Sequence, residues 1–269
     1  MIYVFIGVLI VLVIFLKLIF VDKLKIKWKT FTKKGFRPNR ANFGLYCYTG
    51  NQGKGKTYSL IEYIYDNKDN CIFFGNISNI SCVEYIYTDD ILKSLKSGQK
   101  PFLQGNYIYY KGFDGLIDQK MLLDSGLYDD LIKDKQVIFI FDELFSELQK
   151  QSRLSQSVVD FLSQLRKRKI IFLTTAQVWA EVPLYFRRMS RFQIDCNMIP
   201  LLSSGILIKR FNDAENMKWD DELQEHVAPT LELSVSKTRK AVSECYDTRE
   251  RITKDSMLLP NNDIESKGV

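Results

Sequence analysis

A glycine-rich run of sequence GNQGKGKT is the stretch of this chain whose residue types and spacing point most directly to chemistry. Its members fit the phosphate-cradling pattern G-x-x-x-x-G-K-S/T and are Gly50, Asn51, Gln52, Gly53, Lys54, Gly55, Lys56 and Thr57. Glycine adopts backbone dihedral angles closed to other residues, so successive N–H groups can close around phosphate oxygens. Lys56 is expected to supply a cation for the β- and γ-phosphates, and Thr57 a hydroxyl for Mg²⁺. The pattern therefore predicts a binding site for ATP and Mg²⁺.

Two adjacent carboxylates form the second candidate group. Asp142 and Glu143 follow the apolar run Val137–Phe141, which is typical of a central strand covered on both faces of a parallel sheet. Ligands of open α/β sheets bind at the carboxyl ends of the strands. We therefore expect Asp142 in the Mg²⁺ shell and Glu143 placed to orient or deprotonate the attacking water. The competing interpretation is that the two acids cap the following helix, but it does not explain their coincidence with the glycine-rich run.

Three more polar residues are candidates for roles in catalysis. Gln177 ends a predicted buried strand over residues 170–177, and it either senses the γ-phosphate or the attacking water or is a hydrogen-bonded amide at a strand end. Arg187 and Arg188 lie on a short basic segment with Arg191. One of these arginines could reach the nucleotide of a neighbouring subunit in trans. Salt bridges or contacts with a DNA backbone are the alternative for each of them.

The elements that must position these residues have the order of an α/β fold. A short apolar strand over 43–49 precedes the glycine-rich run and a helix over 57–65 follows it, which is the setting that the phosphate-binding pattern requires. Further strands are expected at 71–75, 136–141, 170–177, 191–197, 205–211 and 230–236, and helices at 90–96 and 155–169. The prediction is a P-loop NTPase with a mainly parallel five-stranded sheet flanked by helices, in which the strands over 191–197 and 205–211 add an antiparallel edge.

Composition narrows the classes of protein further. The chain has 269 residues, of which 46% are hydrophobic and 26% charged, so it can bury a sizeable core. Its five cysteines show no C-x-x-C spacing, which favours buried thiols in a reducing compartment over a zinc site or a disulfide framework. His226 is the single histidine, so a catalytic triad built on histidine is nearly excluded.

The N-terminal 21 residues predict a membrane anchor. Residues 1–21 are apolar apart from Lys17, and about 20 such residues are needed for a helix to cross the hydrocarbon core. The sequence has neither the basic region before the apolar run nor the small-residue cleavage site after it that a cleavable signal peptide needs. A buried core helix at the extreme terminus of a soluble enzyme would not be apolar on all sides. Residues 22–42 are strongly basic, so the positive-inside rule places the N-terminus outside and the rest of the chain in the cytoplasm. The basic residues are expected to contact anionic lipid, with the DNA backbone as the alternative.

These features divide the chain into four parts. We expect a single-pass transmembrane anchor over 1–21, a basic juxtamembrane linker over 22–42, an ATPase domain over 43–248 and a polar, disordered tail over 249–269.

The nucleotide motifs, together with several downstream residues, resemble the zonula occludens toxin-like ATPases of filamentous phages, within the FtsK/HerA-type translocase group. The resemblance covers roughly 44–248 and is carried by GNQGKGKT, the Asn76-Ile77 pair, FIFDE, the block ending in TTAQ, the downstream arginine and the triplet Tyr246-Asp247-Thr248. It implies a membrane-bound ATPase for phage assembly and export, or a related motor that moves DNA. Two departures concern the export role: the apolar segment precedes the ATPase domain, and Lys167 stands where the family commonly has histidine.

The sequence thus favours a membrane-anchored ATPase, acting as a homo-oligomer with a hexamer as one candidate ring, that couples ATP hydrolysis to phage assembly or DNA translocation. Candidate partners are the membrane, DNA and phage assembly proteins. The alternatives are a DNA-packaging ATPase of a membrane-containing virus and a nucleotide-binding membrane scaffold with little turnover. A GTPase is less well supported, because residues 67–70 read NKDN rather than a guanine-reading N-K-x-D. A small-molecule kinase would fit the glycine-rich run alone, but the apolar anchor and the carboxylate pair favour hydrolysis.

Overall fold

The computed structural model describes Gly7, Leu9 and residues 43–144, 156–200, 205–221 and 225–246. The predicted anchor, apart from Gly7 and Leu9, lies outside these residues, as do the predicted linker over 22–42 and the predicted tail over 249–269. In the described part of the chain, no helix has both the length and the hydropathy that crossing a membrane would require.

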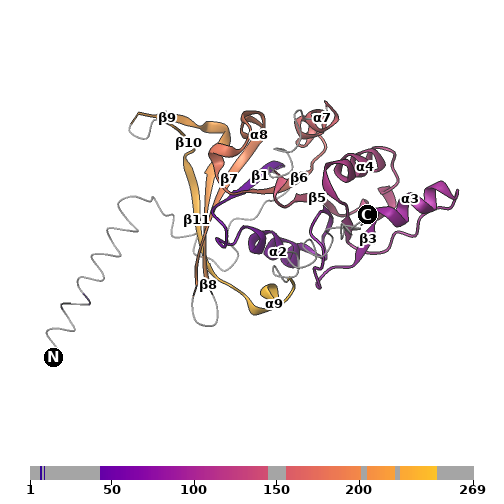
Figure 1. Cartoon of the computed structure of the whole chain (residues 1–269), viewed down its shortest axis with the longest axis horizontal. Coiled ribbons are helices and arrows are strands. Elements are labelled where there is room, and N and C mark those ends of the chain that lie inside the picture. The colour runs from indigo at the N-terminus through magenta and orange to yellow at the C-terminus, as the bar shows by residue number, and fades with distance from the viewer. Residues whose placement is uncertain are drawn as a thin grey trace, which may run out of the picture.

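Nine strands form the main sheet, in the order β11-β8-β7-β1-β6-β5-β2-β4-β3 (Figure 1). Their bounds are β1 Gly44–Thr49, β2 Cys71–Gly75, β3 Tyr85–Tyr87, β4 Tyr107–Tyr109, β5 Gln136–Phe141, β6 Ile171–Ala176, β7 Ser190–Pro200, β8 Gly205–Asp213 and β11 Thr230–Lys237. All pairings from β7 through β3 are parallel, whereas β8 pairs antiparallel with both β7 and β11. Strands β9 (Lys218–Asp220) and β10 (Glu225–Val227) pair separately as an antiparallel ribbon.

The prediction of a five-stranded sheet was therefore too small, although the parallel centre and the antiparallel edge are both present. The sequence pattern did not indicate β3 and β4, which have the same sequence YIY and only three residues each. So short a run shows no periodicity that separates a strand from a loop. The pairing with neighbouring strands is what defines β4. It lies between β2 and β3, and its register with β2 runs from Phe73 opposite Tyr107 to Gly75 opposite Tyr109.

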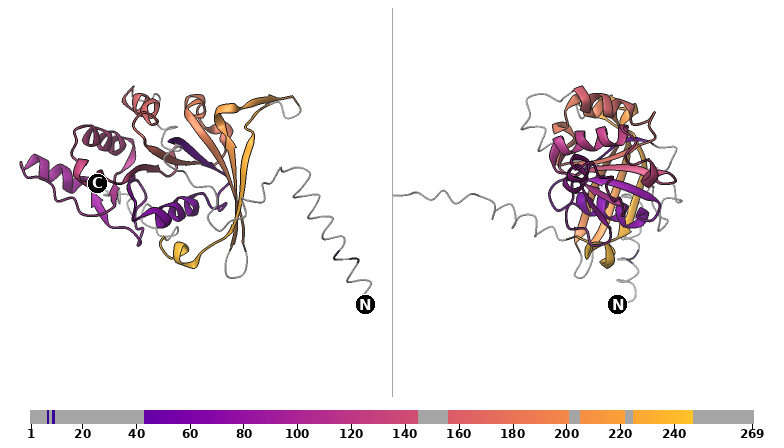
Figure 2. Two further views of the ribbon diagram at one scale, coloured as in Figure 1. Left: turned by 180° about the vertical axis from the view of Figure 1, so that it is seen from behind. Right: turned by 90° about the vertical axis from the view of Figure 1, so that its right-hand side faces the viewer.

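The helices cover both faces of the sheet. Helices α2 (Lys56–Asn67) and α9 (Lys240–Ser243) lie on one face, and α4 (Gly112–Asp124), α7 (Gln156–Gln164) and α8 (Leu184–Met189) lie on the other (Figures 1 and 2). The remaining helices are α3 (Thr88–Lys96) and α5 (Asp129–Ile132), with short 3-10 turns η2 (Trp179–Glu181) and η3 (Ala214–Asn216). The two faces explain why β1, β2 and β6 are buried along their whole length, since their side chains point alternately to one covered face or the other.

Two hydrophobic clusters, one on each face, fix the sheet between the helices. Along β1, Leu45 and Cys47 belong to the cluster that contains residues of α4, α7 and α8, while Tyr46 and Tyr48 belong to the cluster that contains residues of α2. This alternation is the expected consequence of the two-residue period of a strand. All six residues of β1 are buried, so the strand that feeds the glycine-rich loop is firmly held.

One helix is shorter than predicted. The amphipathic pattern predicted a helix over 155–169, but α7 ends at Gln164. Lys169 has a positive φ of 55°, and the Ile170 N–H donates to the Leu165 carbonyl at 2.9 Å. This turn redirects the chain into β6, and the four basic residues after Leu165 therefore lie on a turn at the start of that strand.

Candidate functional site

The glycine-rich loop joins β1 to α2 and contains three glycines with positive φ. These angles are 141° at Gly50, 74° at Gly53 and 86° at Gly55, a region that other residues rarely adopt. At two of these glycines there is also no room for a side chain. A Cβ at Gly50 would lie 2.6 Å from the Cys196 carbonyl oxygen of β7, and a Cβ at Gly55 would lie 2.8 Å from the Leu207 and Met198 side chains.

Backbone hydrogen bonds fix the loop to its neighbours. The Gly50 N–H donates to the Gln177 carbonyl at 3.1 Å, which joins the start of the loop to the end of β6. The Lys54 N–H donates to the Asn51 carbonyl at 3.2 Å, and this bond closes a turn inside the loop. At its far end, the Gly55 carbonyl accepts from both the N–H and the hydroxyl of Ser59, at 2.9 and 2.7 Å.

Lys56 is the first residue of α2, and its ammonium group lies against the loop. Its Nζ donates to the Gly50 carbonyl at 2.6 Å and to the Asn51 carbonyl at 3.2 Å. The N-terminus of a helix carries a partial positive charge and free N–H groups. The lysine, the helix terminus and the glycine backbone are thus combined at one place, and this combination is suited to a phosphate group.

The structure brings Thr57 and Asp142 together, as a metal site requires. The Thr57 hydroxyl donates to Asp142 Oδ2 at 3.1 Å, although 85 residues separate them in sequence. Asp142 is only 3% exposed, and its other oxygen, Oδ1, accepts from the Thr175 hydroxyl at 2.7 Å. Hydroxyl and carboxylate oxygens are ligands that Mg²⁺ prefers, with the remaining positions filled by phosphate oxygens and water. The donor set therefore fits the predicted metal.

Glu143 follows with an exposed side chain and a strained backbone. Its φ is 57°, a left-handed conformation that costs a non-glycine residue on the order of 1–3 kcal/mol. The Glu143 N–H donates to Thr175 Oγ1 at 2.8 Å. Thr175 thus accepts from the backbone of one acid and donates to the side chain of the other. It holds the turn that presents Glu143 beside the buried Asp142.

Asn76 fixes the same turn from the other side. Its Oδ1 accepts from the Asp142 N–H at 2.8 Å, and its Nδ2 donates to the Asp142 carbonyl at 3.0 Å. Asn76 follows β2 and Thr175 lies near the end of β6, and these two strands flank β5. The predicted site did not include either residue. Both residues could have been found from the sequence, because each is a polar residue at the carboxyl end of an apolar strand.

A network of polar side chains joins the end of β1 to strands β7 and β8. The Thr49 hydroxyl donates to Asp195 Oδ1 of β7 at 2.5 Å, and the Asn212 side chain of β8 donates to Asp195 Oδ2 at 2.8 Å. Thr49 and Asn212 are 2% and 5% exposed, so these bonds lie inside the protein. They fix the residue that immediately precedes Gly50.

The predicted sensor Gln177 reaches the loop through its backbone. Its carbonyl accepts from Gly50, as described above, and its side chain is exposed. The proximity of the residue to the loop agrees with the prediction. Contact of the side chain with the γ-phosphate or the attacking water stays a prediction.

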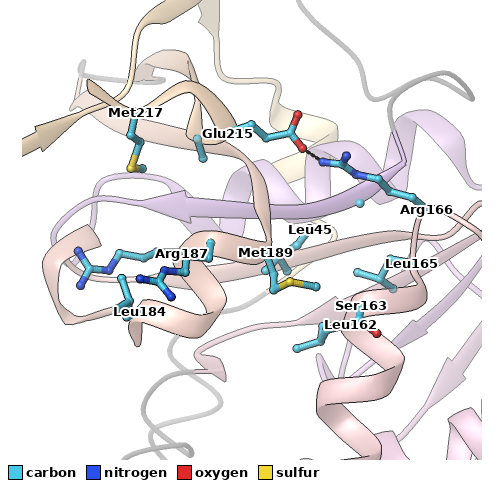
Figure 3. Close-up of a pocket in the computed structure, with 13 residues that line it drawn as sticks. Leu45, Leu162, Ser163, Leu165, Arg166, Leu184, Arg187, Met189, Glu215 and Met217 are labelled. Atoms are coloured by element: carbon cyan, nitrogen blue, oxygen red, sulfur yellow. Dashed lines mark ion pairs between the residues drawn. The ribbon is translucent and has the colours of Figure 1, made fainter. Parts of the chain in front are cut away.

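Arg187 and Arg188 lie at the other end of β1 from the phosphate-binding loop. They are on α8 and line a pocket of about 720 Å³ together with Gly44 and Leu45, the first residues of β1 (Figure 3). The structure therefore does not bring them to the glycine-rich loop of the same chain. A role in trans, at the nucleotide of a neighbouring subunit, stays a prediction.

The cysteines are thiols in the structure, without disulfide partners. Cys47, Cys71, Cys196 and Cys245 are buried and Cys82 is half-buried. Burial raises the pKa of Cys196 to about 11, so this thiol beside the phosphate-binding loop is neutral at physiological pH. The prediction of burial is confirmed for four of the five cysteines.

Comparison with known proteins gives only distant structural likenesses. No protein-family model and no curated protein sequence matches the chain. Similar solved structures include the N-terminal domain of zonular occludens toxin from Neisseria meningitidis, with 15% identity, a TM-score of 0.42, and coverage of 76% of this chain and 98% of that one. Another is the flagellar accessory protein FlaH from Methanocaldococcus jannaschii, with 13% identity, a TM-score of 0.41, and coverage of 81% and 97%.

A third similar structure is the genome packaging NTPase B204 from Sulfolobus turreted icosahedral virus 2 in complex with ATP-gammaS. It has 10% identity and a TM-score of 0.42, and the match covers 76% of this chain and 98% of that one. Likenesses at this level do not define a family for the chain.

Proposed function

We propose that this protein is a membrane-anchored, oligomeric ATPase that couples ATP hydrolysis to phage assembly and export or to DNA translocation. The observation that carries the ATPase proposal is the contact between Thr57 and Asp142, at 3.1 Å, beside a glycine loop closed over Lys56. It supports a site in which a triphosphate and its Mg²⁺ lie between the loop and the end of β5. The motif resemblance to the zonula occludens toxin-like ATPases supports the export role.

The residues of the site have separable tasks in this proposal. The loop N–H groups and Lys56 bind the phosphates, and Thr57 and Asp142 would hold Mg²⁺, which would supply positive charge to neutralise the phosphates. Glu143 orients the attacking water and accepts its proton at a carboxylate oxygen. Asn76 and Thr175 keep the two acids in place through the hydrogen bonds described above.

The test is Mg²⁺-dependent ATP hydrolysis by the full chain and by Lys56→Ala. Removal of a preorganised cation from a phosphate site typically costs about 10²–10³-fold in kcat. The matched control is Lys93→Ala, which removes an equal charge from the exposed face of α3 and should hydrolyse ATP like the parent. If Lys56→Ala retained the parental rate, the assignment of the site would be wrong.

A second set of measurements identifies what the enzyme moves. A DNA motor should show DNA-stimulated ATP hydrolysis that weakens steeply as salt rises, because binding to the phosphate backbone releases counterions. An assembly ATPase driven by protein partners should show no such stimulation. A nucleotide-binding scaffold would bind ATP but fail to convert it even in a single-turnover assay.

A further inference from the structure

The pocket beside Arg187 is separate from the proposed nucleotide site. It is bounded by the start of β1, the end of α7, helix α8 and the η3 region, whereas the glycine loop follows the opposite end of β1. At about 720 Å³ it has the volume of a small-molecule site. Figure 3 shows Leu162 and Leu165 on one side of it and Leu184 and Arg187 on the side of α8.

Some of the charged side chains in this pocket are ion-paired and others are not. Arg166 is ion-paired with Glu215, so these two groups neutralise one another at one side of the pocket (Figure 3). The guanidinium groups of Arg187 and Arg188 make no hydrogen bond or ion pair with any residue that the structure describes, and the Arg187 Nε is buried without an acceptor. Buried donors are nearly always hydrogen-bonded in folded proteins, so this guanidinium calls for an acceptor from outside the described chain.

The walls show what the ligand must carry besides a negative charge. Most of the lining residues other than the arginines and Glu215 are apolar, and they are Leu45, Leu162, Leu165, Leu184, Met189, Ala214 and Met217. A small hydrated anion would leave these walls without a partner. A ligand that joins an anion to an apolar chain would satisfy both parts of the pocket.

The two arginines favour phosphate over carboxylate as the anion. Each guanidinium is a planar fork that can donate two parallel hydrogen bonds. A terminal phosphate has three oxygens to share between two forks, whereas a carboxylate has two. We propose that this pocket binds a terminal phosphate (a phosphate monoester) attached to an apolar chain, as in phosphatidic acid, with Arg187 and Arg188 holding the phosphate.

The position of the pocket in the chain favours a membrane lipid as the source of that phosphate. Gly44 lines the pocket, and the basic segment 22–42 and the apolar segment 1–21 immediately precede this part of the chain. The choice of a lipid rests on the proposed membrane anchoring, but binding of the phosphate by the two arginines does not. A bound lipid would place the start of β1 next to the membrane surface.

The experiment measures binding of dihexanoyl phosphatidic acid, a water-soluble short-chain phospholipid, to the full chain by titration calorimetry in a nonionic detergent. The parent should bind it at least about tenfold more tightly than Arg187→Gln/Arg188→Gln, because the variant loses both charged donors. Lys111→Gln/Lys167→Gln removes the same charge from exposed residues that do not line the pocket, and it should bind like the parent. Equal binding by parent and arginine variant, or equal weakening in the lysine control, would overturn the proposal.

Binding of two further ligands, inorganic phosphate and octanoate, tests which kind of anion the pocket binds. Inorganic phosphate should bind at least about tenfold more weakly than the lipid, because it cannot cover the apolar walls. Equal affinity would mean that free phosphate is the ligand and that the apolar part of the proposal is wrong. Octanoate binding as tightly as the lipid would overturn the choice of phosphate. Lys56→Ala should bind the lipid like the parent, so failure of the ATPase proposal can be told apart from failure of this one.

Discussion

The Thr57 hydroxyl and Asp142 Oδ2 lie 3.1 Å apart, across one intervening strand of the sheet. Thr57 belongs to the helix after β1, Asp142 follows β5, and β6 lies between these two strands. The parallel register places Thr49 opposite Ala176 and Phe141 opposite Thr174, so all three strands end near the same level. The oxygen ligands for a metal are therefore preassembled by the topology of the sheet.

Replacement of Thr175 with valine should lower kcat with little effect on ATP affinity. The change keeps the shape of the side chain but leaves Asp142 Oδ1 and the Glu143 N–H without their partner at this position. A buried group left unpaired costs about 1–3 kcal/mol, which corresponds to roughly 5–150-fold in rate if it acts on the transition state. Steady-state ATP hydrolysis gives kcat and KM separately.

Thr175→Ser is the control for that experiment, because serine keeps the hydroxyl and loses only a methyl group. It should restore most of the parental kcat. Equal losses in the serine and valine variants would show that packing of the methyl group, rather than the hydrogen bonds, is what matters at this position.

Removal of the Asn76 side chain should destabilise the protein as well as slow it. Asn76→Ala leaves both the N–H and the carbonyl of Asp142 without the side chain that brackets them. The expected loss of about 1–3 kcal/mol corresponds to a fall in Tm of roughly 2–10 °C for a domain of this size. The control is Asn216→Ala, since Asn216 is exposed and its one side-chain hydrogen bond among the described residues is a local bond to Asp213. An equal fall in Tm in both variants would show that the two hydrogen bonds from Asn76 to the Asp142 backbone do not stabilise the protein.

The three loop glycines should differ in their sensitivity to alanine. Gly53 has open space around it, so alanine there meets only the backbone cost of a positive φ, on the order of 1 kcal/mol. Gly55→Ala adds contacts at 2.8 Å with flexible side chains, and Gly50→Ala adds a contact at 2.6 Å with a backbone carbonyl. Tm and ATP affinity should therefore fall in the order Gly53, Gly55, Gly50, with the largest loss at Gly50. Any other order would show that the loop adjusts differently.

Alkaline pH should destabilise the protein partly through Cys196. Burial raises the pKa of this thiol to about 11, while the same thiol ionises near 8.5 in the unfolded chain. The unfolded state loses its proton first, so the contribution of the thiol to stability is complete below about pH 8.5 and is lost as pH rises toward 11. The free energy of unfolding, followed by urea titration, should fall over this interval.

In Cys196→Ala, the fall in the free energy of unfolding over this pH interval should be smaller than in the parent, by roughly 3 kcal/mol at most. Part of the decline should remain, because burial also raises the pKa of Cys47 and of Tyr107. An unchanged slope in the alanine variant would mean that Cys196 does not contribute.

Local patterns indicate the main residues of the candidate site, but not the residues whose hydrogen bonds hold them in place. The glycine run, the acids after Phe141 and the strands around them are contiguous in sequence, so their roles follow from motif and periodicity. Asn76 and Thr175 act on residues 66 and 32 to 33 positions away, and only the order of the strands brings them together. Strands β3 and β4 were missed for a similar reason, since pairing defines them. The location of Arg187 likewise depends on β7 running parallel to β1, which no local pattern indicates.

The most direct test of the central claim is ATP turnover by Glu143→Gln, measured beside its binding of Mg²⁺-ATP. The amide keeps the size of the side chain but cannot accept the proton of the attacking water. The proposal predicts Mg²⁺-ATP affinity within about twofold of the parent and a kcat lower by about 10²-fold or more. Turnover at the parental rate with unchanged affinity would contradict the placement of Glu143 at the reacting phosphate.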